Sequence, residues 1–411
     1  MSSQPPAAAP IAVTGIGLVT PMGHTLAEFD DALFAGRSAV TARTIELDGL
    51  EPIQLAVAAC DFDDADKSAS RLPLDRGTAM ALAAARSAWK HAGLDETPPD
   101  GERLGVYWGS GMGGAASFDA TSQALYRDRR RVRPTAVLTT MPNAAVAEIG
   151  LSFGARGAAL GYACACASSA VAIGEAMRAI RGGWLDIAIV GGHDAMLTPA
   201  TMTAWHAMRV TAPPPADAPA TACRPFSADR AGFALGEGAG ALVIESQAHA
   251  LARGARPTQY LSGYATNCDS VHMTSPDPAG QVRAMRAALK EAGLVPGDIG
   301  YINAHGTATG AGDAAEAMSV HQVFGSRAPI SSSKAIHGHL LGGGGAVELI
   351  ATLRALERQT LPITVNLETP DPAFSLDFVR GQARAVRQLR HAMSNSFAFG
   401  GTNAVLIARN G

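Results

Sequence analysis

The run Gly161-Tyr-Ala-Cys-Ala-Cys-Ala-Ser-Ser-Ala170 joins two segments with different hydrophobic patterns. Residues 158–163 are apolar and predict a buried strand. The Ala-rich residues that follow place apolar side chains on one helical face, which ends at Gly182-Gly183. Cys166 is therefore expected where a strand gives way to a helix.

This position makes Cys166 a candidate nucleophile. The positive end of a helix dipole favours thiolate over thiol, so we expect a lowered pKa at Cys166. Free cysteine is also among the most buried residue types and then acts as a small hydrophobe, which is the interpretation for Cys60, Cys164, Cys223 and Cys268. The spacing of the five cysteines fits neither a metal site nor a disulfide framework.

Two histidine motifs follow much later in the chain. His305 lies in Tyr301-Ile-Asn-Ala-His-Gly-Thr-Ala-Thr309, just after a short apolar stretch. Lys334 and His339 lie in Ser331-Ser-Ser-Lys-Ala-Ile-His-Gly-His339. Lysine is scarce in this chain, so composition alone does not account for a lysine between a serine cluster and a histidine. This position is a further indication of a functional site. The order of the motifs predicts a nucleophile assisted by two histidines.

With these motifs, the chain resembles the β-ketoacyl-acyl carrier protein synthases of the thiolase superfamily, most closely their type I and type II elongating enzymes. The likeness covers nearly the whole chain. Besides the motifs above, it includes Val13–Gly23, Arg224–Ala239 and Asn395–Asn403. Six ordered motifs of this length make chance agreement implausible, unlike any single short pattern.

The resemblance implies a decarboxylative Claisen condensation. An acyl group from an acyl carrier protein is held as a thioester on the nucleophile, malonyl-carrier loses its carboxylate, and the resulting enolate attacks the acyl group. The implied roles are Cys166 as nucleophile, His305 and His339 as the two histidines, Lys334 as the lysine with Glu348 as its electrostatic partner, and the backbone N–H groups of Cys166 and Phe399 as the oxyanion hole. The resemblance implies no metal or redox cofactor.

Further residues match family positions that hold the substrate. Phe399 matches the gating phenylalanine, and Asp269, Thr274 and Ser275 match the loop that faces it. Met112 and Trp205 match residues that line the acyl tunnel, although either side chain is equally typical of ordinary core filling. Ala398 stands where glycine is common, so we expect a less mobile gate.

A dense positive cluster at residues 127–133 is a candidate docking surface, because carrier proteins are acidic as a class. Arg130, Arg131 and Arg209 match family positions at the docking entrance. The alternatives are a solvated charged loop and a nucleic-acid surface. A formal net charge of −3, a pI near 6.4 and the lack of a recognisable binding module argue against nucleic acid.

Two glycine motifs imitate nucleotide-binding patterns. Gly109-Ser-Gly-Met-Gly-Gly114 fits G-x-G-x-x-G but lacks an acidic ribose ligand at the expected spacing. Gly15-Ile-Gly17 is followed by Pro21, where a phosphate-binding helix should be established. We interpret both as sites of close backbone packing, and the run Gly342–Gly345 as close packing beside the active site.

Apolar strands alternate with Ala-rich helices, which predicts an α/β protein. The expected strands lie near 11–19, 104–109, 186–191, 239–245, 299–303 and 402–408, and the expected helices near 76–92, 168–181, 279–293 and 344–357. The resemblance adds a five-layer αβαβα thiolase fold made of two similar halves, residues 11–255 and 256–411, after a disordered tail at residues 1–10. It also implies a dimer, either a homodimer or a heterodimer with a homologous subunit.

The N-terminal segment has no basic start and apolar core of the kind that defines a signal peptide, and no run approaches the roughly 18 apolar residues of a membrane span. With cysteines outside any framework, this predicts a cytoplasmic enzyme. Fatty acid elongation competes with a dedicated polyene or aromatic polyketide pathway. A further alternative is a non-catalytic chain-length-factor-like partner subunit. A thiolase that uses coenzyme A is disfavoured, because the last cysteine is Cys268.

Overall fold

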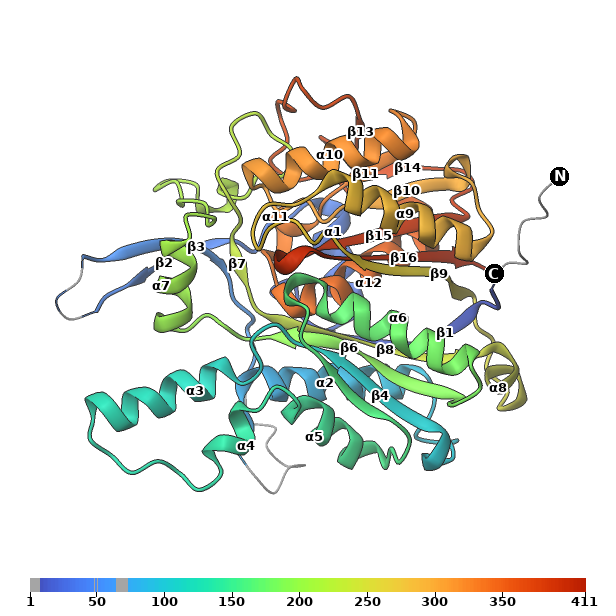
Figure 1. Ribbon diagram of the computed structural model, residues 1–411, viewed down its shortest axis with the longest axis horizontal. Coiled ribbons are helices and arrows are strands. Elements are labelled where there is room, and N and C mark those ends of the chain that lie inside the picture. The colour runs from blue at the N-terminus through green and yellow to red at the C-terminus, as the bar shows by residue number, and fades with distance from the viewer. Residues whose placement is uncertain (1–7, 48, 50, 64–72) are drawn as a thin grey trace.

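The computed structural model describes residues 8–47, 49, 51–63 and 73–411. Its elements alternate between strand and helix as expected (Figure 1). The N-terminal half contains β1 (Ile11–Val19), α1 (Leu26–Ala35), β2 (Thr41–Ile45), β3 (Ile53–Ala58), α2 (Arg76–His91), β4 (Leu104–Gly109), α3 (Ala115–Ser122), α4 (Ala136–Thr140), α5 (Ala144–Phe153), β5 (Ala159–Tyr162), α6 (Ser168–Arg181), β6 (Ile187–Asp194), α7 (Pro199–Ala207), β7 (Leu235–Gly236), β8 (Gly238–Ser246) and α8 (Gln247–Ala252).

The C-terminal half repeats the alternation with fewer insertions. It contains β9 (Gln259–Cys268), α9 (Pro278–Ala292), β10 (Ile299–Asn303), α10 (Gly310–Phe324), β11 (Pro329–Ser331), α11 (Lys334–His337), α12 (Gly344–Arg358), β12 (Thr360–Leu361), β13 (Asp377–Phe378), β14 (Arg384–Ala385), β15 (His391–Phe397) and β16 (Thr402–Asn410).

The two halves have the same strand order. The N-terminal half of the main sheet runs β1-β8-β6-β4-β5 and the C-terminal half runs β9-β16-β15-β10-β11, with β13 added at the edge. In both halves the first two pairings from the centre are antiparallel and the next two are parallel. Only three residue pairs between β1 and β9 join the halves into one hydrogen-bonded sheet. The predicted pair of similar halves is therefore confirmed.

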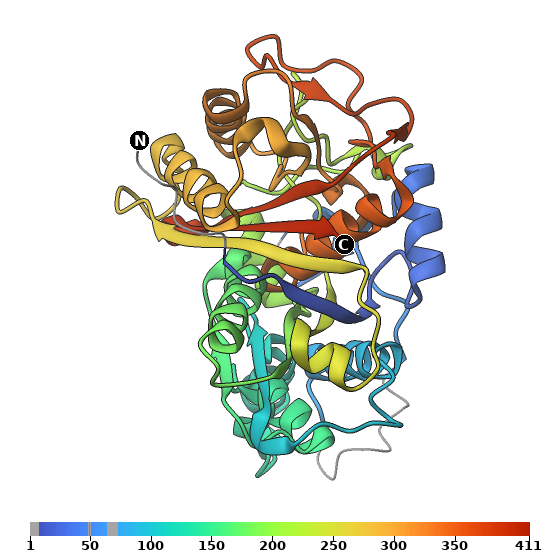
Figure 2. The same ribbon diagram turned by 90° about the vertical axis from the view of Figure 1, so that its right-hand side faces the viewer.

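The layers follow from which strands each helix contacts. Helices α2 and α5 pack on the N-terminal strands, and α9 packs on the C-terminal strands. Between the half-sheets lie α6 and α12, which contact each other and strands of both halves (Figure 2). The sequence of layers is thus helix, sheet, helix pair, sheet, helix, as the resemblance implied. Strands β4, β6 and β8 are buried on both faces, which explains their nearly continuous apolar sequence.

The glycine motifs serve close packing, as the sequence analysis interpreted them. A Cβ at Gly17 would lie 2.1 Å from the Ala84 carbonyl oxygen of α2, and a Cβ at Gly109 would lie 2.3 Å from the backbone of Ser168. Likewise, a Cβ at Gly342 would lie 2.2 Å from the Gly111 nitrogen. These glycines let helices and loops approach the backbone that carries the site.

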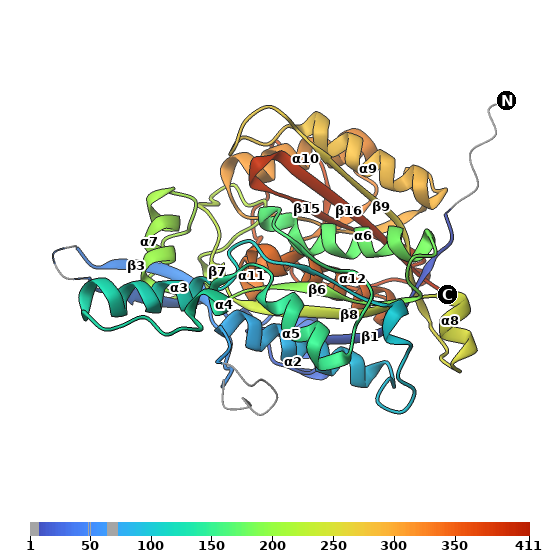
Figure 3. The same ribbon diagram turned by 60° about the horizontal axis from the view of Figure 1, so that its bottom comes forward.

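Several features lie outside the predicted elements. The β2–β3 hairpin and α3 project from the same end of the molecule (Figure 3).

The hypothesis of a disordered tail falls mostly on residues 1–7, which are outside the described residues. Its last part is hydrogen-bonded, because the Ala8 N–H donates to the Glu291 carbonyl and Arg181 donates to the Ala9 carbonyl. In the described part of the chain, no helix combines the length and the apolar character that a membrane crossing requires.

Candidate active site

Cys166 lies in a short 3-10 turn, Ala165–Ala167, directly before α6. Ala165 has a φ of 47°, in the left-handed region that costs energy for a residue with a side chain. The Ser168 hydroxyl holds this turn, because it accepts from the Cys164 N–H at 2.8 Å and donates to the Ala165 carbonyl at 2.7 Å. The strand-to-helix position predicted for Cys166 is therefore confirmed, with a strained turn between the two elements. The prediction that this strand is buried is wrong, because β5 lies at the edge of the sheet and is largely exposed.

The expectation of a lowered cysteine pKa is wrong for this closed site. Cys166 is 5 % exposed, and burial raises the pKa of its thiol to about 12. The positive charge of Lys334 and a hydrogen-bond contribution from the Phe399 backbone act to lower the thiol pKa but do not outweigh burial. The helix end alone does not make this cysteine a thiolate.

His339 contacts the cysteine directly. Its Nε2 lies 3.1 Å from the Cys166 sulfur, and its Nδ1 accepts from the Leu341 N–H at 3.4 Å. The neutral ring therefore carries its proton on Nε2 and directs it at the sulfur. Burial, and then the charge of Lys334, lower the pKa of His339 well below its usual range, so the ring is neutral near pH 7.

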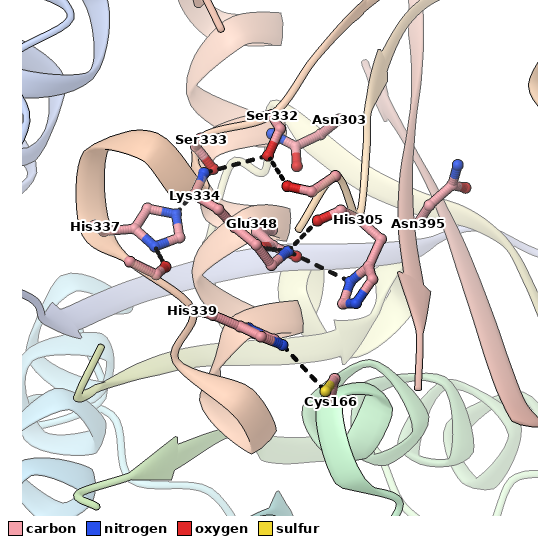
Figure 4. Close-up of polar contacts among 12 residues, drawn as sticks. Cys166, Asn303, His305, Ser332, Ser333, Lys334, His337, His339, Glu348 and Asn395 are labelled. Carbon is pink, nitrogen blue, oxygen red and sulfur yellow. Dashed lines mark hydrogen bonds and ion pairs between the residues drawn. The ribbon is translucent and has the colours of Figure 1, made fainter. Parts of the chain in front are cut away.

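His305 lies in the loop after β10, close to His339. Its ring centroid lies 5.4 Å from that of His339. Lys334 Nζ lies 3.3 Å from His305 Nδ1 and also donates to the His305 carbonyl (Figure 4). Since an ammonium can only donate, Nδ1 accepts and the His305 proton sits on Nε2. Burial and the Lys334 charge keep the pKa of His305 well below its usual range.

Lys334 is fully buried and forms an ion pair with Glu348 of α12. Burial raises the pKa of Glu348 to about 7, and the neighbouring ammonium acts against this increase. The pair thus places a positive charge beside both histidines in a medium of low dielectric constant. The position of Lys334 next to Glu348 agrees with the arrangement that the resemblance implied.

The cysteine and the two histidines border one cavity of about 220 Å³. Cys166, His305 and His339 are on its wall, together with the predicted gate residues Phe399, Asp269, Thr274 and Ser275 and the predicted tunnel residue Trp205. Trp205 stacks on Phe399, with ring centroids 6.1 Å apart and an angle of 19° between the planes. Two stacked aromatic rings thus form part of the cavity wall.

Other predicted residues lie elsewhere. Met112 is not among the cavity-lining residues; it is 44 % exposed, and its N–H donates to Asp194. Arg130 and Arg131 are exposed in the loop after α3, and Arg130 pairs with Asp128 at 2.6 Å. Arg209 is exposed directly between Met208 and Val210, which line the cavity.

The sequence analysis missed several residues that hold the site together. Glu316 accepts from the His305 and Gly306 N–H groups at 2.9 and 2.7 Å, and Asn395 donates to it at 3.2 Å. The Oδ1 atoms of Asn303 and Asn395, which flank His305 in Figure 4, are buried without a hydrogen-bond partner among the described residues. The available signal for Glu316 was a carboxylate in the helical segment that follows the His305 motif.

Asp194 is a second connection that the sequence did not reveal. Its carboxylate accepts from Ser110 Oγ at 2.9 Å and from the N–H groups of Gly111, Met112 and Gly342 at 2.9, 3.0 and 2.6 Å. Burial raises its pKa to about 6, and these hydrogen bonds act to lower it. One buried side chain thus binds the loop after β4 to the glycine run that follows His339.

Ligand atoms of Cys166, His305 and His339 all lie within 4.8 Å of one another, which is close enough to hold a metal ion. The ammonium of Lys334 beside His305 opposes a bound cation by charge repulsion. A thiol next to two neutral imidazole donors suits acyl chemistry instead, because the donors face the place where an oxyanion would develop.

Family models match most of the chain. The N-terminal domain of β-ketoacyl synthase matches residues 8–250, and the C-terminal domain matches residues 259–368. The chain therefore belongs to the β-ketoacyl synthase family, which consists of condensing acyltransferases.

Among similar proteins, nodulation protein E of Rhizobium sp. (strain N33) is 39 % identical over 97 % of this chain and 98 % of its own length. The 3-oxoacyl-[acyl-carrier-protein] synthase 2 of Staphylococcus aureus (strain COL) is 38 % identical over 97 % of both chains. A crystal structure of a β-ketoacyl synthase from Burkholderia phymatum STM815 matches with a TM-score of 0.90 and 35 % identity, over 98 % of this chain and all of that one. The chain is thus a β-ketoacyl synthase of the fatty acid or polyketide kind with the thiolase-like fold.

Solved relatives include complexes. A ketosynthase in complex with its type II polyketide acyl carrier protein matches with a TM-score of 0.89 and 28 % identity, over 98 % of this chain and 99 % of that one. A ketosynthase with its chain length factor from Xenorhabdus doucetiae matches with a TM-score of 0.83 and 27 % identity, over all of both chains.

Proposed function

We propose that this enzyme condenses malonyl-acyl carrier protein with an acyl group held as a thioester on Cys166. The observation that carries the proposal is the contact of the Cys166 sulfur with His339 Nε2 at 3.1 Å, in a cavity that His305 also borders. The Cys166 sulfur attacks the acyl thioester, the bond to the carrier thiol breaks, and the proton of the Cys166 thiol passes to the leaving sulfur. One hard step is thereby divided into two easier ones.

The second half of the cycle uses the histidines. The bond between the malonyl carboxylate and its α-carbon breaks, the carboxylate leaves as carbon dioxide, and its electron pair forms an enolate. The protons on Nε2 of His305 and His339 would stabilise the enolate oxygen, at roughly 3–4 kcal/mol for each well-aimed donor. The carbanion then attacks the acyl carbon, and the Cys166 sulfur leaves. Burial, together with the positive charge of Lys334 in its pair with Glu348, lowers the pKa of both rings and keeps them neutral donors.

Backbone N–H groups of Cys166 and Phe399 form the proposed oxyanion hole of the acyl steps. The Phe399 backbone acts to lower the pKa of the Cys166 thiol, which supports its part. Phe399, with Asp269, Thr274 and Ser275 opposite it, also forms the proposed gate. The stack of Trp205 on Phe399 supports a gate that opens by separating two aromatic rings. Met112 remains a predicted tunnel residue.

Acyl carrier protein is the proposed partner, and Arg130, Arg131 and Arg209 the proposed docking residues. The exposed position of Arg209 next to the cavity wall supports a carrier that docks where its prosthetic arm reaches Cys166. A ketosynthase similar to this chain is in complex with such a carrier. Steering by arginines would increase the rate of encounter with an acidic carrier.

A dimer is the proposed assembly. Large apolar side chains of the α3–α5 region and of the open edge strand β5 are exposed, including Phe118, Tyr126, Val137, Leu151 and Leu160. Exposed apolar side chains beside an open edge strand favour association with a similar subunit, identical or homologous. The complete set of Cys166, His305, Lys334 and His339 favours a catalytic subunit over a chain-length-factor-like role. We place the boundary between the halves at residue 255, after α8.

The test is to incubate the purified protein with acyl-carrier thioesters and to locate the adduct by peptide mass spectrometry, with Cys166→Ala as control. Adduct on Cys166 from saturated chains would support fatty acid elongation, and preference for unsaturated or aryl chains a dedicated pathway. Label on Cys164, or no adduct from any donor even with a partner subunit added, would contradict the proposal.

A further inference from the structure

His337 is a buried histidine that the proposed chemistry does not use. It ends α11, a single turn of four residues that begins with Lys334. Two residues further on lies His339. An isolated helical turn is unstable on its own because nucleation fixes several dihedral angles for one hydrogen bond. Something else must therefore hold the turn that separates the lysine from the histidine.

The imidazole of His337 bridges the two ends of this turn. Its Nε2 lies 2.9 Å from Ser333 Oγ, and its Nδ1 lies 2.7 Å from the Gly338 carbonyl oxygen (Figure 4). Because a carbonyl can only accept, Nδ1 carries a proton and donates to it. Burial and the nearby charge of Lys334 lower the pKa of His337 to about 3, so the ring is neutral and Nε2 accepts from the Ser333 hydroxyl.

The Gly338 carbonyl belongs to the same peptide unit as the His339 N–H. That N–H donates to the Ala234 carbonyl at 2.7 Å, and the His339 carbonyl accepts from the Gly236 N–H at 3.0 Å. The peptide before His339 is thus held from both sides, by β7 and its approach on one side and by the His337 ring on the other. Its plane sets where the His339 side chain starts, and hence the 3.1 Å contact with Cys166.

The other end of the bridge fixes the residue before Lys334. The Ser333 carbonyl accepts from the Ile336 N–H at 2.9 Å, so Ser333 is part of the turn as well as a partner of the ring. Lys334 leaves this point to reach Glu348 and His305. A single fully buried ring therefore links the starting points of both side chains.

We propose that His337 is a positioning residue, which sets the distance between Lys334 and His339 by tying Ser333 to the peptide bond that precedes His339. This proposal rests on the proposed roles of Lys334 and His339. It predicts that loss of the bridge displaces the His339 donor from the sulfur. Misplacement of a catalytic group by about 1 Å costs roughly a hundredfold in rate.

The variants can divide the bridge into its two contacts. His337→Asn keeps an amide near the position of Nδ1 but is too short to reach Ser333, and Ser333→Ala removes the same contact from the other side. His337→Ala removes both contacts. His193→Asn is the matched control, because His193 is equally buried and has one hydrogen bond, from the Trp108 indole N–H at 2.8 Å.

The readouts are kcat and KM for condensation, the pH profile of Cys166 alkylation by iodoacetamide, and Tm. We expect His337→Ala to lower kcat roughly tenfold to a hundredfold with KM changed less than about twofold. Alkylation should need a higher pH, because the His339 donor no longer stabilises the thiolate. His337→Asn and Ser333→Ala should have smaller, equal effects, and their combination should be no worse than either.

The proposal is overturned if the folded His337 variants lower only Tm, as His193→Asn should, and leave both kcat and the alkylation profile unchanged. If His337→Ala does not fold, the Asn and Ser333 variants decide the question in the same way. If the wild-type protein does not condense its substrates, the proposed function fails, while the alkylation profile still tests the link between His337 and Cys166.

Discussion

The N-terminal and C-terminal halves share one strand order but bring different chemistry to the same strand ends. In the main sheet, the third strand along the chain is β5 in the N-terminal half and β11 in the C-terminal half. Cys166 follows β5, whereas Lys334 and His339 follow β11. The second strand of the main sheet is β10 in the C-terminal half and β4 in the N-terminal half. His305 follows β10, whereas the insertion that contains α3 and α4 follows β4. One half thus supplies the nucleophile and a projecting surface, and the other supplies the donors and the charge.

The difference shows how a repeated scaffold can divide one reaction. Parallel strands bring their following loops to one edge, where ligands bind in open α/β sheets. Because the half-sheets face each other across α6 and α12, the two edges meet at one cavity. Changes in either half should therefore affect different steps of the same cycle.

The largest expected effect separates these steps. His305→Ala should lower the rate of malonyl decarboxylation by roughly 10²–10³, because one donor to the enolate is lost. Acylation of Cys166 should remain, since the contact of His339 with the cysteine sulfur is still in place. Carbon dioxide release and adduct formation, measured on the same preparation, check this. Equal losses in both steps would contradict the division between the halves.

A second effect concerns the charge in the C-terminal half. Lys334→Met leaves Glu348 buried without its partner, which typically costs about 3–5 kcal/mol of unfolding free energy. Because burial already raises the pKa of Glu348 to about 7, the variant should lose less stability at pH 5, where the carboxyl takes up a proton. Urea unfolding at pH 5 and pH 8 measures this. The double variant Lys334→Met/Glu348→Gln should recover stability at pH 8, and a variant without pH dependence would contradict the account.

A third effect concerns a carboxylate of the N-terminal scaffold. Burial raises the pKa of Glu245, but hydrogen bonds from His249, Arg253 and Thr14 outweigh burial and lower it to about 2. A lowered folded-state pKa contributes stability that is complete above pH 4.5 and is lost as the pH falls towards 2. We expect this contribution to be roughly 3 kcal/mol. Glu245→Gln should flatten the unfolding free energy between pH 6 and pH 2, and an unchanged slope would count against it.

The smallest expected effect lies on the surface. Arg130→Glu and Arg131→Glu should raise the KM for the carrier by roughly threefold to tenfold at low salt, with kcat unchanged, because rim charges act mainly on encounter. The effect should fade at high salt, where the charges are screened. Arg286→Glu, an exposed arginine on α9 of the other half, is the control. Equal changes in all three variants would argue against a local docking surface.

The fold was largely readable because its evidence is local. The expected strands at 11–19, 104–109 and 299–303 have the observed bounds, since strands buried on both faces leave nearly continuous apolar runs. Strands β9 and β15 were missed, because polar residues such as Thr266, Asn267 and Asn395 interrupt their patterns.

The site was readable in its reacting groups but not in their support. Motifs revealed Cys166, His305, Lys334 and His339, and the structure brings these four together. The expected direction of the Cys166 pKa shift was wrong, because burial depends on how the layers pack and not on the motif. Asp194 was missed because its partners lie in remote segments, and His337 because its contacts with Ser333 and Gly338 depend on how the turn between them folds.

The most direct test of the account is a single-turnover condensation. The protein is acylated on Cys166, the donor is removed, and malonyl-carrier labelled at its carboxylate is added. The account predicts one labelled carbon dioxide and one 3-oxoacyl product for each acyl group lost from Cys166. Loss of the acyl group by hydrolysis, with no new carbon–carbon bond, would contradict it.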